Sequence, residues 1–171
     1  RRDSVGDQLP VAVGELGAAI VRVLQAEGVA ACGKHFPGHG DTSTDSHHEL
    51  PLIEHPPEQL RDREFLPFRA AIAAGVATIM TAHVFIPALD DTRPATLSSR
   101  IVSGLLRGEL GFEGVIISDD LEMKALANEW AVPDSAVEAI AAGCDAVLIC
   151  SGDHDTQAAA LEAIVKRVES D

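Results

Sequence analysis

Short apolar runs alternate with longer amphipathic segments along the whole chain. The apolar runs, each the length of a buried strand, cover residues 29–33, 76–80, 115–118 and 146–150. The amphipathic segments predict helices at about residues 10–27, 57–74, 98–110, 134–142 and 155–168, with a short helical turn at 121–128. This alternation is typical of a parallel sheet whose strands are joined by helices. We therefore predict an α/β fold with four strands, each followed by a helix.

Individual residues refine the predicted helices. Apolar residues of the first helix recur at the spacing of one helical face, at Leu16, Ile20, Val23 and Leu24. Pro67 is expected to kink or divide the second helix, because proline removes a backbone donor and clashes with the preceding turn. The candidate N-caps of the next two long helices are Ser98 or Ser99 and Asp134 or Ser135.

The segment from Lys34 to Pro51 contains four of the seven histidines in the chain. Its two glycines and two prolines interrupt regular structure, so we predict a loop that follows the first strand. In parallel α/β sheets, the loops after the strands carry the functional groups. The loops after the other three strands contain His83, Asp119–Asp120 and residues 151–154. We therefore expect these groups to lie at one end of the sheet.

Carboxylates and imidazoles in these loops suggest acid–base or nucleophilic chemistry. Asp119 follows the third strand, where a nucleophile or a metal ligand would be held rigidly; the alternative is that Asp119 or Asp120 caps the next short helix. Asp45 lies two residues before His47, so its carboxylate can hydrogen-bond the imidazole and set its tautomer. An imidazole with the ordinary pKa near 6.5 exchanges protons near neutral pH. The alternative for His47 is a position in a solvated polar loop.

Lys34 and His35 begin the same loop, where they can donate hydrogen bonds to a polyhydroxylated or anionic ligand. The alternative is a charge that faces solvent at the end of the strand. A metal site is a further interpretation, because His39, Asp41 and His48 add potential ligands. The spacing matches no HExxH or Cys/His pattern, and the glycines form no dinucleotide fingerprint. We therefore expect no metal and no other cofactor.

Composition and net charge limit the molecules that this chain is expected to bind and the compartment in which it is expected to occur. The net charge of −14 disfavours nucleic acid and anionic membranes, because phosphates repel an acidic surface. No apolar run reaches the ~20 residues of a membrane span, so none is expected. The three cysteines form no disulfide or zinc pattern, which favours a reducing compartment and a cytoplasmic location. Because the chain opens on Arg1 rather than Met, a secreted or lipid-anchored form stays open.

Several segments together carry a family resemblance. They are KHFPGHG at 34–40, DSH at 45–47, Ala82-His83, LLRGELGF at 105–112 and ISDDLEM at 117–123. In this order and spacing they resemble the glycoside hydrolase family 3 β-N-acetylglucosaminidases over most of the chain. The resemblance implies a (β/α)8 TIM barrel that removes terminal β-linked N-acetylglucosamine, from muropeptides or chitooligosaccharides, with retention of configuration.

The resemblance also implies roles for individual residues. Asp119 resembles the nucleophile that forms a covalent glycosyl-aspartate, His47 the general acid/base, and Asp45 the partner of His47. Lys34 and His35 resemble residues that bind the sugar hydroxyls. Retaining enzymes usually combine two carboxyl groups, so a histidine acid/base departs from the common pattern. Because histidine carries no negative charge, it would repel an anionic nucleophile less, and a phosphorylase that uses the same residues is a serious alternative.

The chain differs from a full barrel in length. A (β/α)8 barrel has eight strands in about 250 residues, whereas four strands are predicted here. We therefore expect residues 1–171 to be a single partial catalytic domain, the second half of the barrel with strands five to eight, whose partner is a missing N-terminal half. The family's sugar-binding arginine would fall near the start, where the spacing departs from the Arg-Ser-Phe pattern and Arg2 is the candidate. The alternative to an enzyme is a non-catalytic α/β domain that binds a metal or a small ligand.

Overall fold

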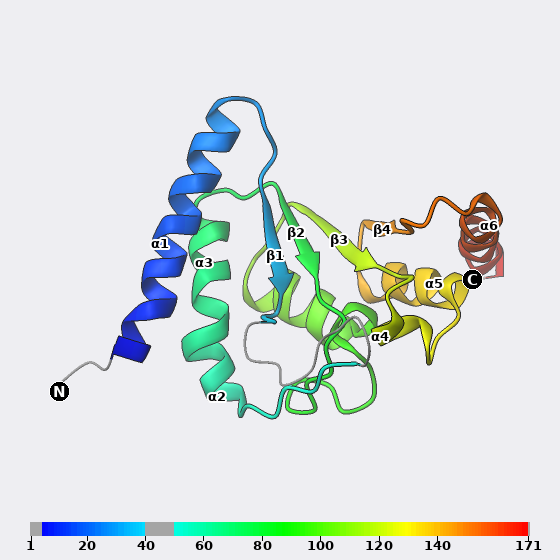
Figure 1. Ribbon diagram of the computed structural model, residues 1–171, viewed down its shortest axis with the longest axis horizontal. Helices are drawn as coiled ribbons and strands as arrows, with labels where there is room; N and C mark the ends of the chain where they lie inside the picture. Colours follow the sequence, from blue (N-terminus) through cyan, green and yellow to red (C-terminus); the bar gives the residue numbers. More distant parts are fainter. Residues whose placement is uncertain (1–4, 40–49, 171) are drawn as a thin grey trace.

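The computed structural model describes residues 5–39 and 50–170, and its centre is a four-stranded parallel sheet in the order β1-β2-β3-β4 (Figure 1). The strands are β1 (Cys32–Phe36), β2 (Thr78–Thr81), β3 (Val115–Asp120) and β4 (Ala146–Leu148). The helices are α1 (Val5–Ala26), α2 (Pro57–Gln59), η1 (Leu60–Glu64), α3 (Phe65–Ala73), η2 (Ala95–Leu97), η3 (Arg100–Glu109), α4 (Lys124–Ala127), α5 (Val132–Ala142) and α6 (His154–Ser170). The predicted α/β fold with four parallel strands is confirmed.

The first strand lies further along the chain than its apolar run predicted. We expected residues 29–33, but β1 extends to Phe36, whose carbonyl accepts the Ala82 N–H at 2.7 Å. Pairing with the neighbouring strand and burial of Phe36 therefore outweigh the polarity of Lys34 and His35. These two residues belong to the strand and not to the following loop, which corrects the prediction.

The ladder between β1 and β2 contains an irregularity that matters for the site. Cys32 and Gly33 pair with consecutive residues of β2, but Phe36 pairs with Thr81, so the register shifts between Gly33 and Phe36. Because successive side chains of a strand alternate between faces, a shift of one residue exchanges the two faces. Phe36 therefore faces the helical layer, where it packs against α3, and His35 faces the opposite side of the sheet.

Three phenylalanine rings anchor this end of β1 to the helical layer. Phe36 is fully buried and packs against Phe68 at 5.1 Å between ring centroids, edge to face. It also meets Phe65 at 6.1 Å in a tilted arrangement. Both rings come from α3, so the cluster fixes the last residue of β1 relative to that helix.

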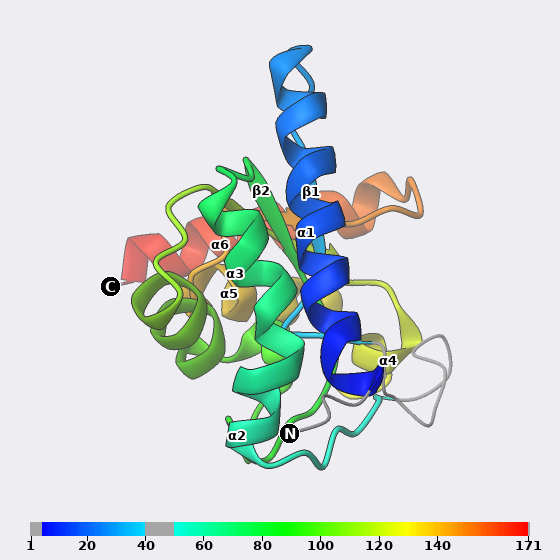
Figure 2. The ribbon, with the colours of Figure 1, turned by 90° about the vertical axis from the view of Figure 1, so that its left-hand side faces the viewer.

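Helices α1 and α3 lie side by side, and Figure 2 shows them in front of β1 and β2. Their close approach depends on small residues: a Cβ on Gly14 would meet the Cβ of Ala70 at 3.1 Å. Among residues 9–26 of α1, the buried ones are Gly14, Ala18 and Val21. The helix therefore packs through small side chains, and not through the large apolar face that its periodicity indicated.

Seven apolar side chains of α1 are exposed. They are Leu9, Val11, Val13, Leu16, Ile20, Val23 and Leu24. Leu9–Ala26 is long and apolar enough to cross a membrane, but signal sequences and the core helices of soluble proteins can have the same length and composition. The length and composition of α1 therefore do not test the expectation of no membrane span.

Other element boundaries differ from the predictions in ways that proline and serine explain. The break expected at Pro67 occurs earlier, as the π-helical turn η1, so that Pro67 falls in the first turn of α3, where a missing N–H costs little. Of the two candidate caps before η3, Ser98 is the one whose hydroxyl accepts the Ile101 N–H, at 3.2 Å. Helix α5 begins at Val132, so the prediction that Asp134 or Ser135 caps it was wrong.

Candidate active site

Asp119 lies near the carboxyl end of β3, on the face of the strand that is not covered by helices. Ile116 and Ser118 are fully buried, whereas Ile117 and Asp119 on the alternate face are partly exposed. The structure includes both aspartates in the strand, which was predicted to end at residue 118. A strand-borne carboxylate is held more rigidly than one in a loop.

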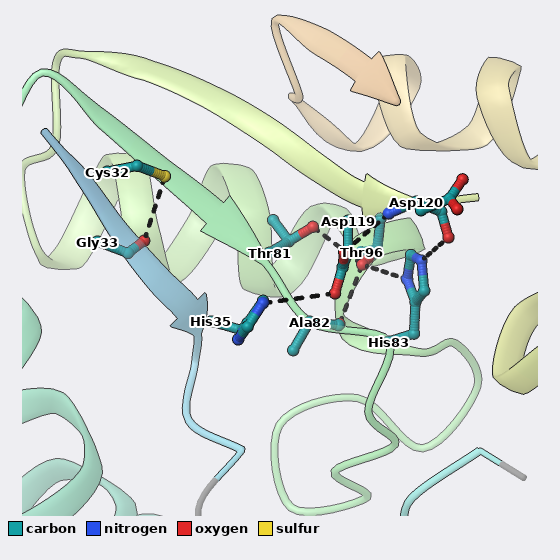
Figure 3. Close-up of polar contacts among 9 residues, drawn as sticks. All are labelled: Cys32, Gly33, His35, Thr81, Ala82, His83, Thr96, Asp119 and Asp120. Atoms are coloured by element: carbon teal, nitrogen blue, oxygen red, sulfur yellow. Dashed lines mark hydrogen bonds and ion pairs between the residues drawn. The ribbon is translucent and has the colours of Figure 1, made fainter. Parts of the chain in front are cut away.

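His35 and Asp119 meet across the sheet, as Figure 3 shows. His35 Nε2 lies 3.7 Å from Asp119 Oδ2. The two strands are not neighbours in the sheet order, and the contact exists because the register shift in β1 turns His35 to the face of Asp119. Asp119 Oδ1 accepts the N–H of Asp120 at 2.9 Å, so Oδ2 is the oxygen directed at the imidazole.

The surroundings of His35 favour its neutral form. Partial burial lowers the pKa of His35, because a charged imidazole loses water contact there. The nearby Asp119 carboxylate raises the pKa, and the Lys34 and His39 charges lower it, so the net direction is downward. A neutral imidazole can both donate and accept hydrogen bonds, which suits recognition of a hydroxyl group.

Asp120 has a different role from its neighbour. Its Oδ1 accepts the backbone N–H of Glu122 at 3.2 Å and that of Cys150 at 3.3 Å. The carboxylate therefore joins the end of β3 to the segment after β4. Glu122 extends this link, because its carboxylate accepts the Ser151 N–H at 2.6 Å. Asp120 Oδ1 is thus engaged by two backbone amides, whereas Asp119 Oδ2 faces His35 and the cavity.

The structure adds His83, which sequence reasoning placed at a strand end and in the resemblance but gave no role. His83 is 1% exposed, and its ring bonds Thr96 Oγ1 and the Asp120 carbonyl, each at 2.9 Å. Burial lowers the pKa of His83, although the carbonyl bond and the charges of Asp119 and Asp120 oppose this. Thr96 lies thirteen residues further along the chain, so no local pattern could have indicated the pair.

A cavity of about 820 Å³ opens beside Asp119. Lys34, His35, His39 and Glu64 give its polar wall, and the remaining wall is largely apolar. Its apolar wall includes Val13, Ile20 and Leu24, which belong to the exposed apolar side chains of α1. The cavity therefore brings the predicted residues Lys34, His35 and Asp119 together.

Three predicted site residues lie outside the described residues. They are Arg2, Asp45 and His47. The potential metal ligands Asp41 and His48 lie outside as well. Within residues 5–39 and 50–170, no group of three or more His, Cys, Asp or Glu side chains could hold a metal ion. Of the predicted site residues, the described part of the chain therefore contains Lys34, His35 and Asp119.

Comparison with known proteins identifies the family. The sequence profile described as "Glycosyl hydrolase family 3 N terminal domain" matches residues 7–170. The chain belongs to glycoside hydrolase family 3. This membership confirms the family resemblance and the α/β fold of TIM-barrel type.

Several relatives match most of this chain. A β-hexosaminidase of Nitrosospira multiformis is 43% identical over 150 residues, which span 88% of this chain and 43% of that protein. A solved family 3 β-N-acetylglucosaminidase from Paenibacillus sp. is 51% identical with a TM-score of 0.89, covering 92% of this chain and 30% of that one. A β-N-acetylhexosaminidase structure from Beutenbergia cavernae is 34% identical with a TM-score of 0.81, covering 90% and 45%. The family 3 chain described here thus spans less than half of each of these relatives.

Proposed function

We propose that this family 3 chain carries the nucleophile of a retaining glycosidase that removes terminal β-linked N-acetylglucosamine. The observation that carries the proposal is the position of Asp119, partly exposed beside the cavity and 3.7 Å from His35. The names of the β-hexosaminidase and β-N-acetylglucosaminidase relatives supply the reaction class. Muropeptides and chitooligosaccharides are the proposed substrates.

In the proposed first step, Asp119 Oδ2 attacks the anomeric carbon while the bond to the leaving oxygen breaks. His47 donates a proton to that oxygen, and the product is a covalent glycosyl-aspartate. In the second step, His47 takes a proton from water, the water oxygen bonds to the anomeric carbon, and Asp119 is released. Asp45 is proposed to orient His47 and to favour its charged form.

Lys34 and His35 are the proposed sugar-binding residues, with Arg2 as a third candidate. The lysine ammonium donates hydrogen bonds, and the neutral imidazole of His35 can donate or accept them. His35 also lies beside Asp119, so a bound hydroxyl between them would place the anomeric carbon near the carboxylate. Positioning of this kind is a large part of enzymatic rate enhancement.

We further propose that the chain forms strands five to eight of the barrel and is joined by other barrel segments. The exposed apolar face of α1 supports this, since exposed apolar patches of this kind mark interaction surfaces. Within the described residues, β1 and β4 are also edges of the sheet, and an uncovered edge can pair with a further strand. Residues 1–171 alone should therefore hydrolyse a chromogenic N-acetylglucosaminide barely or not at all. A rate near that of a full-length relative would refute the proposal.

The reaction is tested on the full-length protein with a chromogenic N-acetylglucosaminide. Asp119→Asn should abolish release of the chromophore, whereas Asp120→Asn, the matched control, should retain it in part. Repeating the assay with inorganic phosphate tests the alternative acceptor, because a phosphorylase would yield the sugar phosphate. Equal losses in the two variants would contradict the assignment of Asp119.

A further inference from the structure

The ring of His83 is fixed on both sides inside the protein. Its Nε2 lies 2.9 Å from the carbonyl oxygen of Asp120. Because a carbonyl oxygen only accepts hydrogen bonds, Nε2 carries a proton and donates it. On the other side, Nδ1 lies 2.9 Å from Thr96 Oγ1 (Figure 3). The ring orientation and the protonated nitrogen are thus defined by geometry.

The hydroxyl of Thr96 can satisfy His83 in either charge state. Thr96 is fully buried, and besides His83 its Oγ1 lies 3.0 Å from the Ala82 carbonyl and 2.9 Å from Thr81 Oγ1. When Nδ1 is bare, Thr96 donates to it; when Nδ1 is protonated, Thr96 accepts and donates to Ala82 instead. In both states Thr81 can donate to Thr96. The bond from Nε2 to the Asp120 carbonyl is therefore kept throughout.

The same residue, Asp120, also contacts the candidate nucleophile. The Asp120 carbonyl accepts from His83, and the Asp120 N–H donates to Asp119 Oδ1 at 2.9 Å. Asp120 is thus held from its carbonyl side while its amide holds the Asp119 carboxylate. A fixed backbone here leaves Asp119 Oδ2 as the oxygen directed at His35 and the cavity.

We propose that His83 is a positioning residue that fixes the orientation of the Asp119 carboxylate through the backbone of Asp120. His83 is 1% exposed and has almost no surface open to a ligand, so it acts through Asp120 and not on the sugar. The proposal rests on the proposed function of Asp119 as the nucleophile. It also specifies Oδ2 as the attacking oxygen, because Oδ1 is engaged by the Asp120 amide.

Three variants of the full-length protein test this proposal kinetically. His83→Met keeps volume but removes the donor, and should lower kcat about 10- to 100-fold with KM little changed, because small misplacements of a reacting group are costly. His83→Gln places an amide N–H at the same distance along the side chain and should restore much of the rate. Ser98→Ala is the matched control, since it removes a buried hydrogen bond to Asp90 that lies outside this network. It should leave kcat near that of the wild type.

Nuclear magnetic resonance gives a readout that does not depend on activity. In the wild type, the imidazole spectrum should show a protonated Nε2 across the pH range in which the protein is folded. The Asp120 amide and the Asp119 carboxyl resonances should shift in His83→Met and remain in place in Ser98→Ala. If the wild type hydrolyses no glycoside, Asp119 is not the nucleophile, yet these shifts still decide whether His83 orients it. A wild-type kcat in His83→Met, equal losses in Met and Gln variants, or unmoved resonances would overturn the proposal.

Discussion

The aromatic cluster at the end of β1 should contribute measurably to stability, because it anchors the residue next to His35. Phe36 is fully buried and lies 5.1 Å from Phe68, within the range of favourable aromatic pairs. Replacing a fully buried phenylalanine with alanine typically costs about 3–5 kcal/mol. Phe36→Ala should therefore lower the free energy of unfolding by about that amount, a large share of the 5–15 kcal/mol typical of a domain.

A double-mutant cycle isolates the contact between the two rings. Phe36→Leu, Phe68→Leu and the double variant keep most of the buried volume, and the coupling energy should be about 0.5–1.5 kcal/mol. Urea denaturation followed by circular dichroism and by the fluorescence of Trp130 measures each free energy of unfolding. The m-values should stay equal across the set. A coupling energy near zero, with Phe36→Ala costing less than about 1 kcal/mol, would contradict the packing described here.

Two further predictions concern stability. Arg107 donates to the Phe112 carbonyl at 2.9 Å and pairs with Asp145, so Arg107→Gln should lower the free energy of unfolding by about 1–3 kcal/mol, and an unchanged urea midpoint would count against this role. Burial lowers the pKa of His83 and of His35 in the folded state below the usual 6.5, so the unfolded chain binds more protons as the solution is acidified. The contribution of these two histidines to the free energy of unfolding should therefore be fully present above about pH 6.5 and be lost as the pH falls below that value. The fall should be shallower in His83→Gln. A free energy of unfolding that rises on acidification would refute this prediction.

The order of elements follows from the sequence because each strand is a short apolar run between helices. Residues 115–118 illustrate this. Ile116 and Ser118 are buried on one face of the strand, and Asp119 comes next, on the alternate face. The exact limits of β1 could not be read in the same way. Lys34 and His35 are polar, and they join the strand because β2 pairs with it as far as Phe36.

The inward face of α1 was also hidden from the hydrophobic pattern. Its large apolar residues mark one face of the helix, but the packed contact uses Gly14, Ala18 and Val21. The apolar periodicity of α1 therefore marks a face that is exposed in this chain, and the contact with α3 lies on another face. Whether that face is buried depends on the segments that surround the helix, and the hydrophobic pattern of residues 1–171 does not show them.

The candidate site was predictable where it depends on strand ends, and not where it depends on tertiary contacts. Asp119 follows an apolar run, lies near the end of β3 and could be singled out from this position. The contact of His35 with Asp119 depends on a register shift, and the His83–Thr96 pair depends on a loop that returns to the sheet. Neither relation has a local signature in the sequence.

The central claim is that Asp119 forms a covalent bond to the sugar, and trapping that intermediate tests it most directly. The full-length protein is incubated with a fluorinated N-acetylglucosaminide that forms the glycosyl-enzyme faster than water releases it, and the labelled peptide is identified by mass spectrometry. We predict one sugar per protein, attached to Asp119, and no label in Asp119→Asn. Label on Asp120 or another carboxylate, or hydrolysis of the chromogenic substrate with no label on Asp119, would contradict the account.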